Sequence, residues 1–298
     1  MRYGRVLRSE REDPAEPQPA RDQGVEHVRW FSRIPPAAEV VPSPNIWYHQ
    51  QAYEVENRAQ DVDGEIWRVL RAEHNWTAAD VLDIGCGDGY HLPYFARDAR
   101  SVLGVEPHPP LARDAQRRVQ DLANVRVRKG RAQRLPADDA SVDLVHARTA
   151  YFFGPGCEPG LREAERVLRP GGSILIVDLD VTSEPYGRWM RTDLPHYDPP
   201  AVERFFAAHG FGCRRVTTRW RFADITAAES VLRIEFSAKV AQQAIADVRR
   251  LNPGPGEVTV PVGYRVHSRG KPTGLVLPGH SAASPDSPGS SSTSPRIE

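Results

Sequence analysis

The chain has 298 residues, enough for one large domain or two small ones. Apolar residues make up 40% of it, which excludes a wholly disordered or fibrous chain. Its 39 basic residues balance 39 acidic ones, so a uniformly basic nucleic-acid-binding protein is not expected.

The two ends of the chain differ from its middle in composition. Residues 1–26 are dominated by charged residues and proline, and residues 276–298 by serine and proline, so both are predicted to be disordered. The N-terminal segment lacks the apolar stretch of a secretory signal, and no segment approaches the roughly 20 apolar residues that span a bilayer. Cys86, Cys157 and Cys213 show none of the C-x-x-C spacing of zinc sites. We expect a soluble, cytoplasmic protein without a metal site.

The predicted elements begin with helix and then alternate. Residues 45–75 are predicted to be helical, within an N-terminal helical cap over residues 27–78. From residue 79 on, short apolar segments alternate with amphipathic ones, which is typical of β-α-β units and a parallel sheet. The predicted strands are residues 80–84, 102–105, 125–128, 141–147 and 174–179. The predicted helices are residues 90–100, 110–123 and 158–168.

The regular alternation of strands and helices ends after the fifth strand. We expect a helix over residues 201–209, a strand over 215–222, one long helix over 226–251 and a last strand over 258–266. The predicted fold class is therefore α/β: a Rossmann-like, doubly wound, mostly parallel seven-stranded sheet with helices on both faces, in one domain over residues 79–275.

The sharpest signal is the glycine-rich run Asp83-Ile84-Gly85-Cys86-Gly87-Asp88-Gly89, between a predicted strand and a predicted helix. Glycines there let the backbone approach a ligand and adopt positive φ, and the next helix offers unpaired N–H groups. Seventeen residues past Gly89, at the end of the second strand, Glu106 can accept two hydrogen bonds from a ribose diol. The two features together predict a site for an adenosine-containing cofactor rather than a turn that only connects strand and helix.

The glycine spacing discriminates between cofactors. Dinucleotide sites use G-x-G-x-x-G, whereas this chain has Gly85-x-Gly87-x-Gly89. Asp83, two residues earlier, is awkward for a pyrophosphate and convenient for an ammonium group. The run therefore favours S-adenosylmethionine (SAM), and a nicotinamide-dependent oxidoreductase is the disfavoured alternative.

These motifs resemble the class I SAM-dependent methyltransferases, in their small-molecule, methyltransferase type 11-like branch. The resemblance covers roughly residues 80–181 and continues more weakly to residue 266. Besides the glycine run and Glu106, it rests on residues 131–136, 141–145 and 163–172. It implies an enzyme that transfers a methyl group from SAM to a small-molecule acceptor by in-line displacement. An alternative of another class is a catalytically inactive SAM-binding scaffold or sensor module.

The resemblance also implies roles for individual residues. Asp83 would contact the methionine end of the cofactor, and Glu106 would accept its ribose hydroxyls. Arg131 departs from the family pattern, because many relatives carry there an Asp that accepts from the adenine amine, which a guanidinium cannot do. Pro107 and Ala132 would flank the adenine. The implied cofactor-binding residues are Asp83, Gly85, Cys86, Gly87, Gly89, Glu106, Pro107, Arg131, Ala132, Ala147 and Arg148, the last two closing the methionine side.

The acceptor side is less determined. Displacement at a sulfonium depends mainly on placing the acceptor, and a general base is needed only if the acceptor must lose a proton. The candidates for such a role are His91, Tyr151 and His196, and the catalytic residue stays open. Phe152 and Phe153 stand where relatives often have histidines, so they indicate either an apolar or planar acceptor or packing under the sheet.

Several further residues have two interpretations. Asp178 and Asp180 could bind a metal, although paired acids at the end of a strand more often cap a loop. His146 is expected to be a core histidine. Residues 183–200, with Tyr186, Trp189 and Tyr197 among them, are expected to form a lid over the cofactor. The expected partner is a small-molecule acceptor, not nucleic acid or a membrane, and the protein is expected to be a monomer or homodimer.

Overall fold

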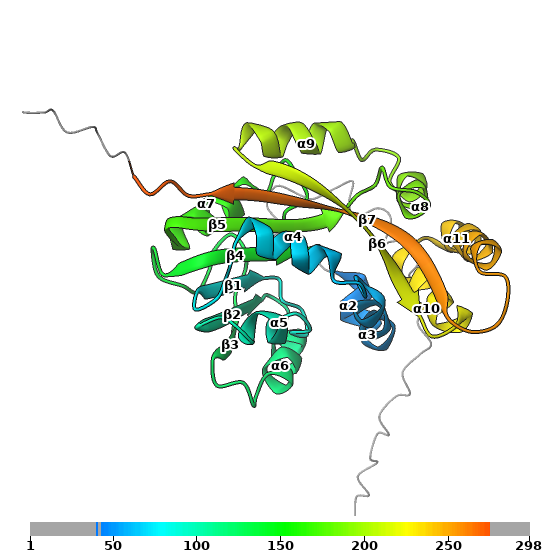
Figure 1. Cartoon of the computed structure of the whole chain (residues 1–298), viewed down its shortest axis with the longest axis horizontal. Coiled ribbons are helices and arrows are strands. Elements are labelled where there is room, and N and C mark those ends of the chain that lie inside the picture. Colours follow the sequence, from blue (N-terminus) through cyan, green and yellow to red (C-terminus); the bar gives the residue numbers. More distant parts are fainter. Residues whose placement is uncertain (1–39, 41–42, 275–298) are drawn as a thin grey trace, which may run out of the picture.

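The structure is a computed structural model that describes residue 40 and residues 43–274 (Figure 1). The predictions of disorder for residues 1–26 and 276–298, and the first part of the predicted cap, lie outside the described residues.

A seven-stranded sheet runs through the molecule in the order β3-β2-β1-β4-β5-β7-β6 (Figure 1). The first five strands are parallel, whereas β7 runs antiparallel to both of its neighbours. The strands are β1 (Asp80–Ile84), β2 (Ser101–Glu106), β3 (Val125–Lys129), β4 (Val142–Arg148), β5 (Leu168–Leu179), β6 (Gly212–Phe222) and β7 (Val258–Gly270). The predicted mostly parallel, doubly wound sheet is confirmed. Its strand order reverses between β1 and β4, which places a crevice at their carboxyl ends.

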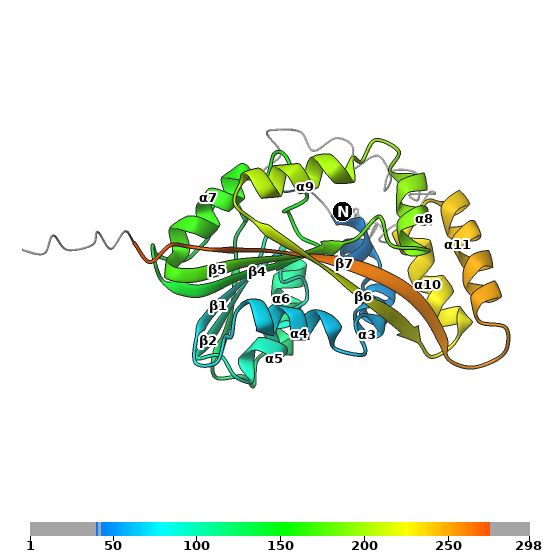
Figure 2. The same cartoon turned by 45° about the horizontal axis from the view of Figure 1, so that its top comes forward.

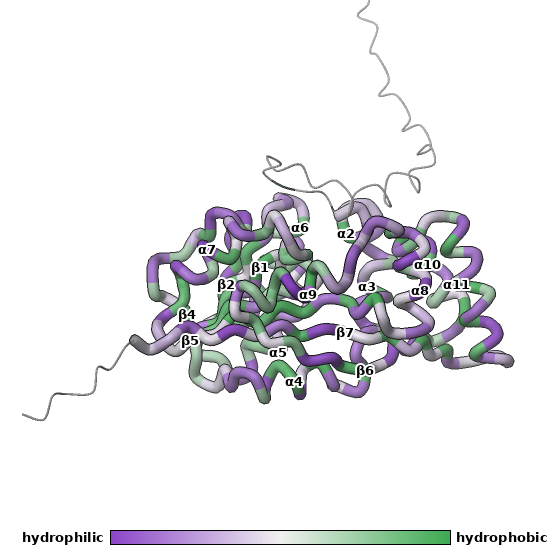
Figure 3. The backbone as a smooth tube through the Cα atoms, turned by 90° about the horizontal axis from the view of Figure 1, so that it is seen from above, coloured by the Kyte–Doolittle hydropathy of each residue, from purple (hydrophilic) through white to green (hydrophobic). Residues whose placement is uncertain are grey.

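Helices cover both faces of the sheet. Helices α7 (Glu158–Val167) and α9 (Pro199–Ala208) lie on one face, and α4 (Glu65–Glu73) and α5 (Leu92–Ala96) on the other (Figure 2). Helix α6 (Pro109–Arg118) packs against β2 and β3. Figure 3 shows hydrophobic residues along the central strands and a mixture of both kinds along the surrounding helices.

Each face of the sheet has its own apolar core, because successive strand side chains point to opposite faces. In β1, Leu82 and Ile84 pack in the core that contains Leu161 of α7. Val81 instead packs in the core that contains Phe95 of α5. Both faces of the strand are therefore buried, as its mostly apolar sequence indicates.

The predicted N-terminal helix over residues 45–75 is three helices: α2 (Pro44–Tyr48), α3 (Gln50–Ala59) and α4. Between α3 and α4 the backbone turns through Gly64, which has a φ of +72°. The Asp61 carboxylate accepts hydrogen bonds from the backbone of Ile66, at 3.0 Å, and Trp67, and so satisfies the start of α4.

The predicted long helix over residues 226–251 is divided into α10 (Ile225–Glu235) and α11 (Ala238–Leu251). The break lies at Ser237, whose backbone N–H and hydroxyl donate to the two carboxylate oxygens of Asp193, at 2.7 and 2.5 Å. Asp193 belongs to α8 (Tyr186–Asp193), a helix that the sequence analysis did not predict. A contact between distant segments thus starts the new helix.

Only part of the expected lid over residues 183–200 lies at the cavity: residues 192–198, with Tyr197 among them, line it, whereas two aromatics of α8 do not. Tyr186 and Trp189 are buried in the core, each 1% exposed, rather than facing the cavity described below. The Tyr186 hydroxyl donates to Glu235 at 2.7 Å, and the Trp189 ring N–H donates to Asp247 at 2.9 Å. These aromatics pack α8 against α10 and α11.

Candidate cofactor and acceptor site

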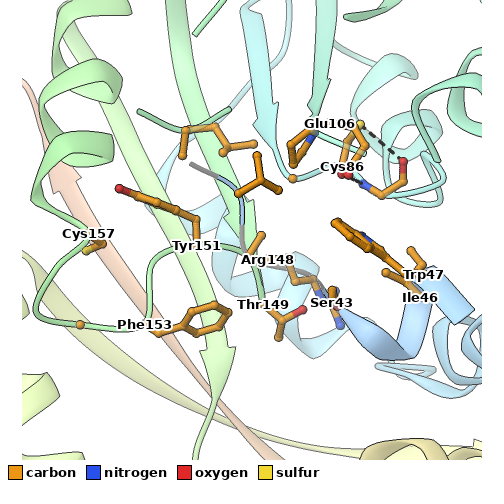
Figure 4. Close-up of a pocket in the computed structure, with 18 of the residues that line it drawn as sticks. Ser43, Ile46, Trp47, Cys86, Glu106, Arg148, Thr149, Tyr151, Phe153 and Cys157 are labelled. Carbon is orange, nitrogen blue, oxygen red and sulfur yellow. Dashed lines mark hydrogen bonds between the residues drawn. The ribbon is translucent and has the colours of Figure 1, made fainter. Parts of the chain in front are cut away.

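A cavity of about 1390 Å³ opens at the carboxyl ends of the parallel strands. Ile84 of β1, Glu106 of β2 and Arg148 of β4 each line it. Figure 4 shows Glu106 and Cys86 at one end, Tyr151, Phe153 and Cys157 at the other, and Arg148 and Thr149 between them. The cavity thus lies where the strand order reverses, which is where open α/β sheets bind ligands.

The glycine loop has the backbone that its sequence predicts. Gly85, Gly87 and Gly89 have φ values of +70°, +57° and +82°. A Cβ on Gly85 would lie 2.6 Å from the Cβ of Ala150, and one on Gly87 would lie 2.8 Å from Cδ1 of Ile46. Gly85 and Gly87 line the cavity, whereas Gly89 does not and packs against α6.

Glu106 is held at the end of β2 by two backbone donors. Its Oε2 accepts from the N–H of Gly87 at 3.0 Å, and its Oε1 accepts from the N–H of His108 at 2.9 Å. The side chain is 4% exposed, and burial raises its pKa to about 7. The carboxyl group therefore braces the glycine loop and titrates near neutral pH.

Helix α2 covers this end of the cavity. The Trp47 ring stacks on the ring of His108, with centroids 4.0 Å apart and planes 12° apart. Ile46 lies over Gly87, and both α2 residues line the cavity opposite Glu106 (Figure 4). The adenosine end predicted from the sequence is therefore roofed by aromatic and aliphatic side chains.

Asp83 lies behind the cavity rather than in its wall. It is the register partner of His146 on the neighbouring strand β4, and its Oδ1 lies 2.7 Å from Nδ1 of that histidine. Both side chains are buried, with 4% and 1% exposed. His146 is thus a buried histidine with a polar partner, as expected.

The cavity brings most of the implied cofactor residues together. Those that line it are Gly85, Cys86, Gly87, Glu106, Pro107, Arg131, Ala132 and Arg148. Those that do not are Asp83, Gly89 and Ala147.

The three candidates for proton transfer all line the cavity. His91 is surrounded by aromatic rings, including that of Trp67 at 5.8 Å, and desolvation by burial lowers its pKa well below the usual value, so its imidazole is neutral at pH 7. Burial raises the pKa of Tyr151 to about 12, so its hydroxyl stays protonated. His196 is exposed.

The paired acids after β5 are used within the protein. The Asp178 carboxylate lies 3.0 Å from the guanidinium of Arg265. Asp180 caps a loop, since its Oδ1 accepts from the backbone and hydroxyl of Thr182 at 3.0 and 2.6 Å. Within the described part of the chain, no cluster of three or more His, Cys, Asp or Glu side chains could hold a metal ion.

A polar face of α3 lines the cavity, and its residues Asn57 and Gln60 were not singled out from the sequence. Tyr53, Asn57 and Gln60 line the cavity from this side, and Oε1 of Gln60 accepts from Nη2 of Arg148 at 2.7 Å. Their positions i, i+4 and i+7 share one helix face. That spacing was the available signal, but it does not show which way the face points.

Tyr151 rests on α7 at a glycine. A Cβ on Gly160 would lie 2.3 Å from Cε1 of the Tyr151 ring. We expect Gly160→Ala to destabilise the protein by about 1–3 kcal/mol, because the ring must move. In a Tyr151→Ala background the same change should stabilise by up to about 1 kcal/mol, because alanine favours helix more than glycine does. Urea unfolding of the four proteins of this cycle tests the expected reversal of sign. The same sign in both backgrounds would contradict the packing.

Residues 82–176 match the family model of a methyltransferase domain. They belong to the methyltransferase domain family. The match runs from β1 into β5 and so contains the glycine loop, Glu106 and the aromatic segment after β4. S-adenosylmethionine is the cofactor of this domain. The structure fits it, because a side chain would obstruct the loop at Gly85 and a buried carboxyl group stands at the end of β2.

Several curated proteins are similar to part of this chain. An uncharacterised methyltransferase of Bacillus subtilis is 32% identical over 117 residues, 39% of this chain and 44% of that protein. A fatty-acid O-methyltransferase of Mycolicibacterium smegmatis is 32% identical over 145 residues, 48% of this chain and 47% of that protein. The chain spans about half the length or less of the curated relatives that it matches.

The fold of the methyltransferase domain is also that of solved structures. A candidate methyltransferase from Bacillus halodurans superposes with a TM-score of 0.51 at 17% identity, over 70% of this chain and 100% of that one. Across the residues that the structure describes, no helix combines the length and apolar character needed to cross a membrane.

Proposed function

We propose that the protein transfers a methyl group from S-adenosylmethionine to a small-molecule acceptor by in-line displacement. The supporting observation is one continuous cavity with the glycine loop and Glu106 at one end and the aromatic segment after β4 at the other (Figure 4). Its volume of about 1390 Å³ exceeds the range of about 300–1,000 Å³ typical of a pocket for one drug-sized ligand. A cofactor and an acceptor can therefore lie side by side.

The chain's own residues bind the cofactor and orient it toward the acceptor. The backbone of the glycine loop cradles the methionine part of the cofactor, and Glu106 accepts from its ribose hydroxyls. Pro107 and Ala132 flank the adenine, while Arg148 closes the methionine side. Helices α2 and α3 act as a cap over the cavity and exclude water from the reacting atoms. The bound cofactor supplies the electrophilic methyl group.

Rate enhancement then rests chiefly on alignment of the acceptor with the sulfonium methyl. A hydroxyl or phenol acceptor also loses a proton. His91 is suited to take it, because it lines the cavity beside the glycine loop and is neutral at pH 7. The Tyr151 hydroxyl, protonated up to about pH 12, is not a base.

Calorimetric titration with S-adenosylmethionine and S-adenosylhomocysteine tests the proposal. We expect both to bind at a single site with micromolar affinity. Absence of binding by folded protein that is free of carried-over ligand would contradict it. Tight binding without methylation of any acceptor would instead favour an inactive cofactor-binding module.

The affinity for S-adenosylhomocysteine should depend on pH through Glu106. Ribose hydroxyls donate to the ionised carboxylate, so binding favours deprotonation of a group whose pKa in the free protein is about 7. Affinity should therefore rise by about tenfold between pH 6 and pH 8 and level off above that. Titration calorimetry at several pH values measures it, with Glu106→Gln as the control whose affinity should be flat. Equal slopes in both proteins would assign the titration to another group.

A further inference from the structure

We propose that the acceptor is an uncharged, largely apolar molecule bound in the part of the cavity formed by residues 149–159, residues 192–202 and Ser237. This part is called the acceptor arm below. The inference rests on the proposed methyl transfer and specifies the class of molecule that receives the methyl group.

The acceptor arm begins beside the glycine loop, where Ala150 adjoins Gly85, and extends away from it. In Figure 4, Tyr151, Phe153 and Cys157 lie across the cavity from Glu106, with Thr149 between the two ends. The arm therefore holds a second ligand beside the cofactor rather than part of the cofactor itself.

The surface of the arm is mainly apolar. Phe153 and Pro155 contribute from the loop after β4, Leu194 and Pro195 from the segment that leads into α9, and Val202 from α9 itself. Prolines and ring side chains lose little conformational freedom when a ligand binds. Such a wall favours a rigid or planar apolar body.

The two carboxylates and the Tyr197 hydroxyl of the arm have hydrogen-bond partners within the protein. Both carboxylate oxygens of Asp193 accept from Ser237, and Oδ1 of Asp198 accepts from the backbone of Ala201 at 3.0 Å. The Tyr197 hydroxyl accepts from Arg265 at 2.7 Å. Oδ2 of Asp198 lies 3.9 Å from Arg204 in a solvent-exposed ion pair, so a ligand amine would share carboxylates that already have partners and would gain little.

An anionic acceptor is disfavoured for a related reason. Among the described residues that line the cavity, the arginines are Arg131 and Arg148, and no lysine lines it. Neither arginine belongs to the arm: Arg131 follows β3, and Arg148 ends β4, where Gln60 accepts from it. A carboxylate or phosphate buried in the arm would lose its hydration with no arginine or lysine of the arm to compensate.

Three probes with one ring system and different charges test the inference. They are 2-naphthalenemethanol, 2-naphthoate and 2-naphthylmethylammonium, titrated into protein saturated with S-adenosylhomocysteine. We expect the neutral probe to bind at least about tenfold more tightly than either ion, because only the ions lose hydration without compensation. Tighter binding of naphthoate would show that Arg148 anchors an anion, and tighter binding of the ammonium would show that a carboxylate is available. Either result overturns the inference, as does failure of the neutral probe to bind.

A charged side chain placed in the arm provides a second, independent test. Ala201 lines the arm and is only partly exposed. Ala201→Lys should therefore lower the affinity for the neutral probe and raise the affinity for naphthoate, each by about tenfold. The affinity for S-adenosylhomocysteine should not change. Ala207 is on the same helix, is exposed and does not line the cavity. Ala207→Lys should therefore change none of these three affinities. No change in Ala201→Lys would overturn the location. If S-adenosylhomocysteine itself fails to bind the unmodified protein, the proposed function fails before the probes are used.

Discussion

Gly85→Ala is expected to weaken S-adenosylhomocysteine binding by at least about 100-fold, which corresponds to about 2.7 kcal/mol. The new Cβ would lie 2.6 Å from the Cβ of Ala150, an atom fixed to the backbone, so the loop after β1 or the loop after β4 must shift. Both loops line the cavity. Titration calorimetry measures the loss, with circular dichroism as the check on folding.

Gly64→Ala is the matched control for that variant. Gly64 has a φ of +72°, close to the +70° of Gly85, but a Cβ there would meet nothing within 4 Å. The two changes therefore impose a similar backbone strain of about 1–3 kcal/mol, and only Gly85→Ala adds a steric clash at the cavity. Gly64→Ala should lower stability and leave binding unchanged. Affinity of Gly85→Ala within about threefold of the unmodified protein would contradict the assigned loop.

Glu106→Ala is expected to weaken cofactor binding by about 1–3 kcal/mol, or about 5–150-fold. The side chain offers two acceptor oxygens to the ribose and also holds the N–H groups of Gly87 and His108. Glu106→Gln keeps one acceptor oxygen and should therefore lose less binding free energy than Glu106→Ala. Calorimetry with S-adenosylhomocysteine measures both variants.

A ligand without the hydroxyl separates the two roles of Glu106. The unmodified protein should prefer S-adenosylhomocysteine to its 2′-deoxy analogue, and Glu106→Ala should bind both about equally. If Glu106 only supports the glycine loop, the variant weakens both ligands by the same factor and the preference persists. That result would refute the ribose assignment while leaving the cofactor site in place.

The residues that local chemistry constrains were predictable. Positive φ at Gly85, Gly87 and Gly89 follows from the need to turn from a strand into a helix within a few residues, and glycine is the residue that does so without strain. Glu106 is the first charged residue after the apolar residues 102–105. The sequence therefore places it at the carboxyl end of β2. Such features depend on neighbours in the chain, so a single sequence reveals them.

Features that depend on distant partners were not predictable in the same way. The helix over residues 226–251 breaks at Ser237 because Asp193, 44 residues earlier, accepts from it. Asp83 looked like a cofactor ligand, yet its Oδ1 bonds His146, 63 residues away, and it does not line the cavity. Helical periodicity and motif spacing contain no information about either contact.

The sequence by itself determined the seven β-strands in their chain order, the glycine loop with its positive φ values, and the acid at the end of β2. Only the tertiary structure decided that α3 turns Asn57 and Gln60 toward the cavity, that α8 packs its aromatics into the core, and which groups bond Asp198 and Tyr197. The physical reason is that backbone geometry and periodicity are local, whereas the direction of a helix face and the partner of a buried polar group are set by which segments the fold brings together.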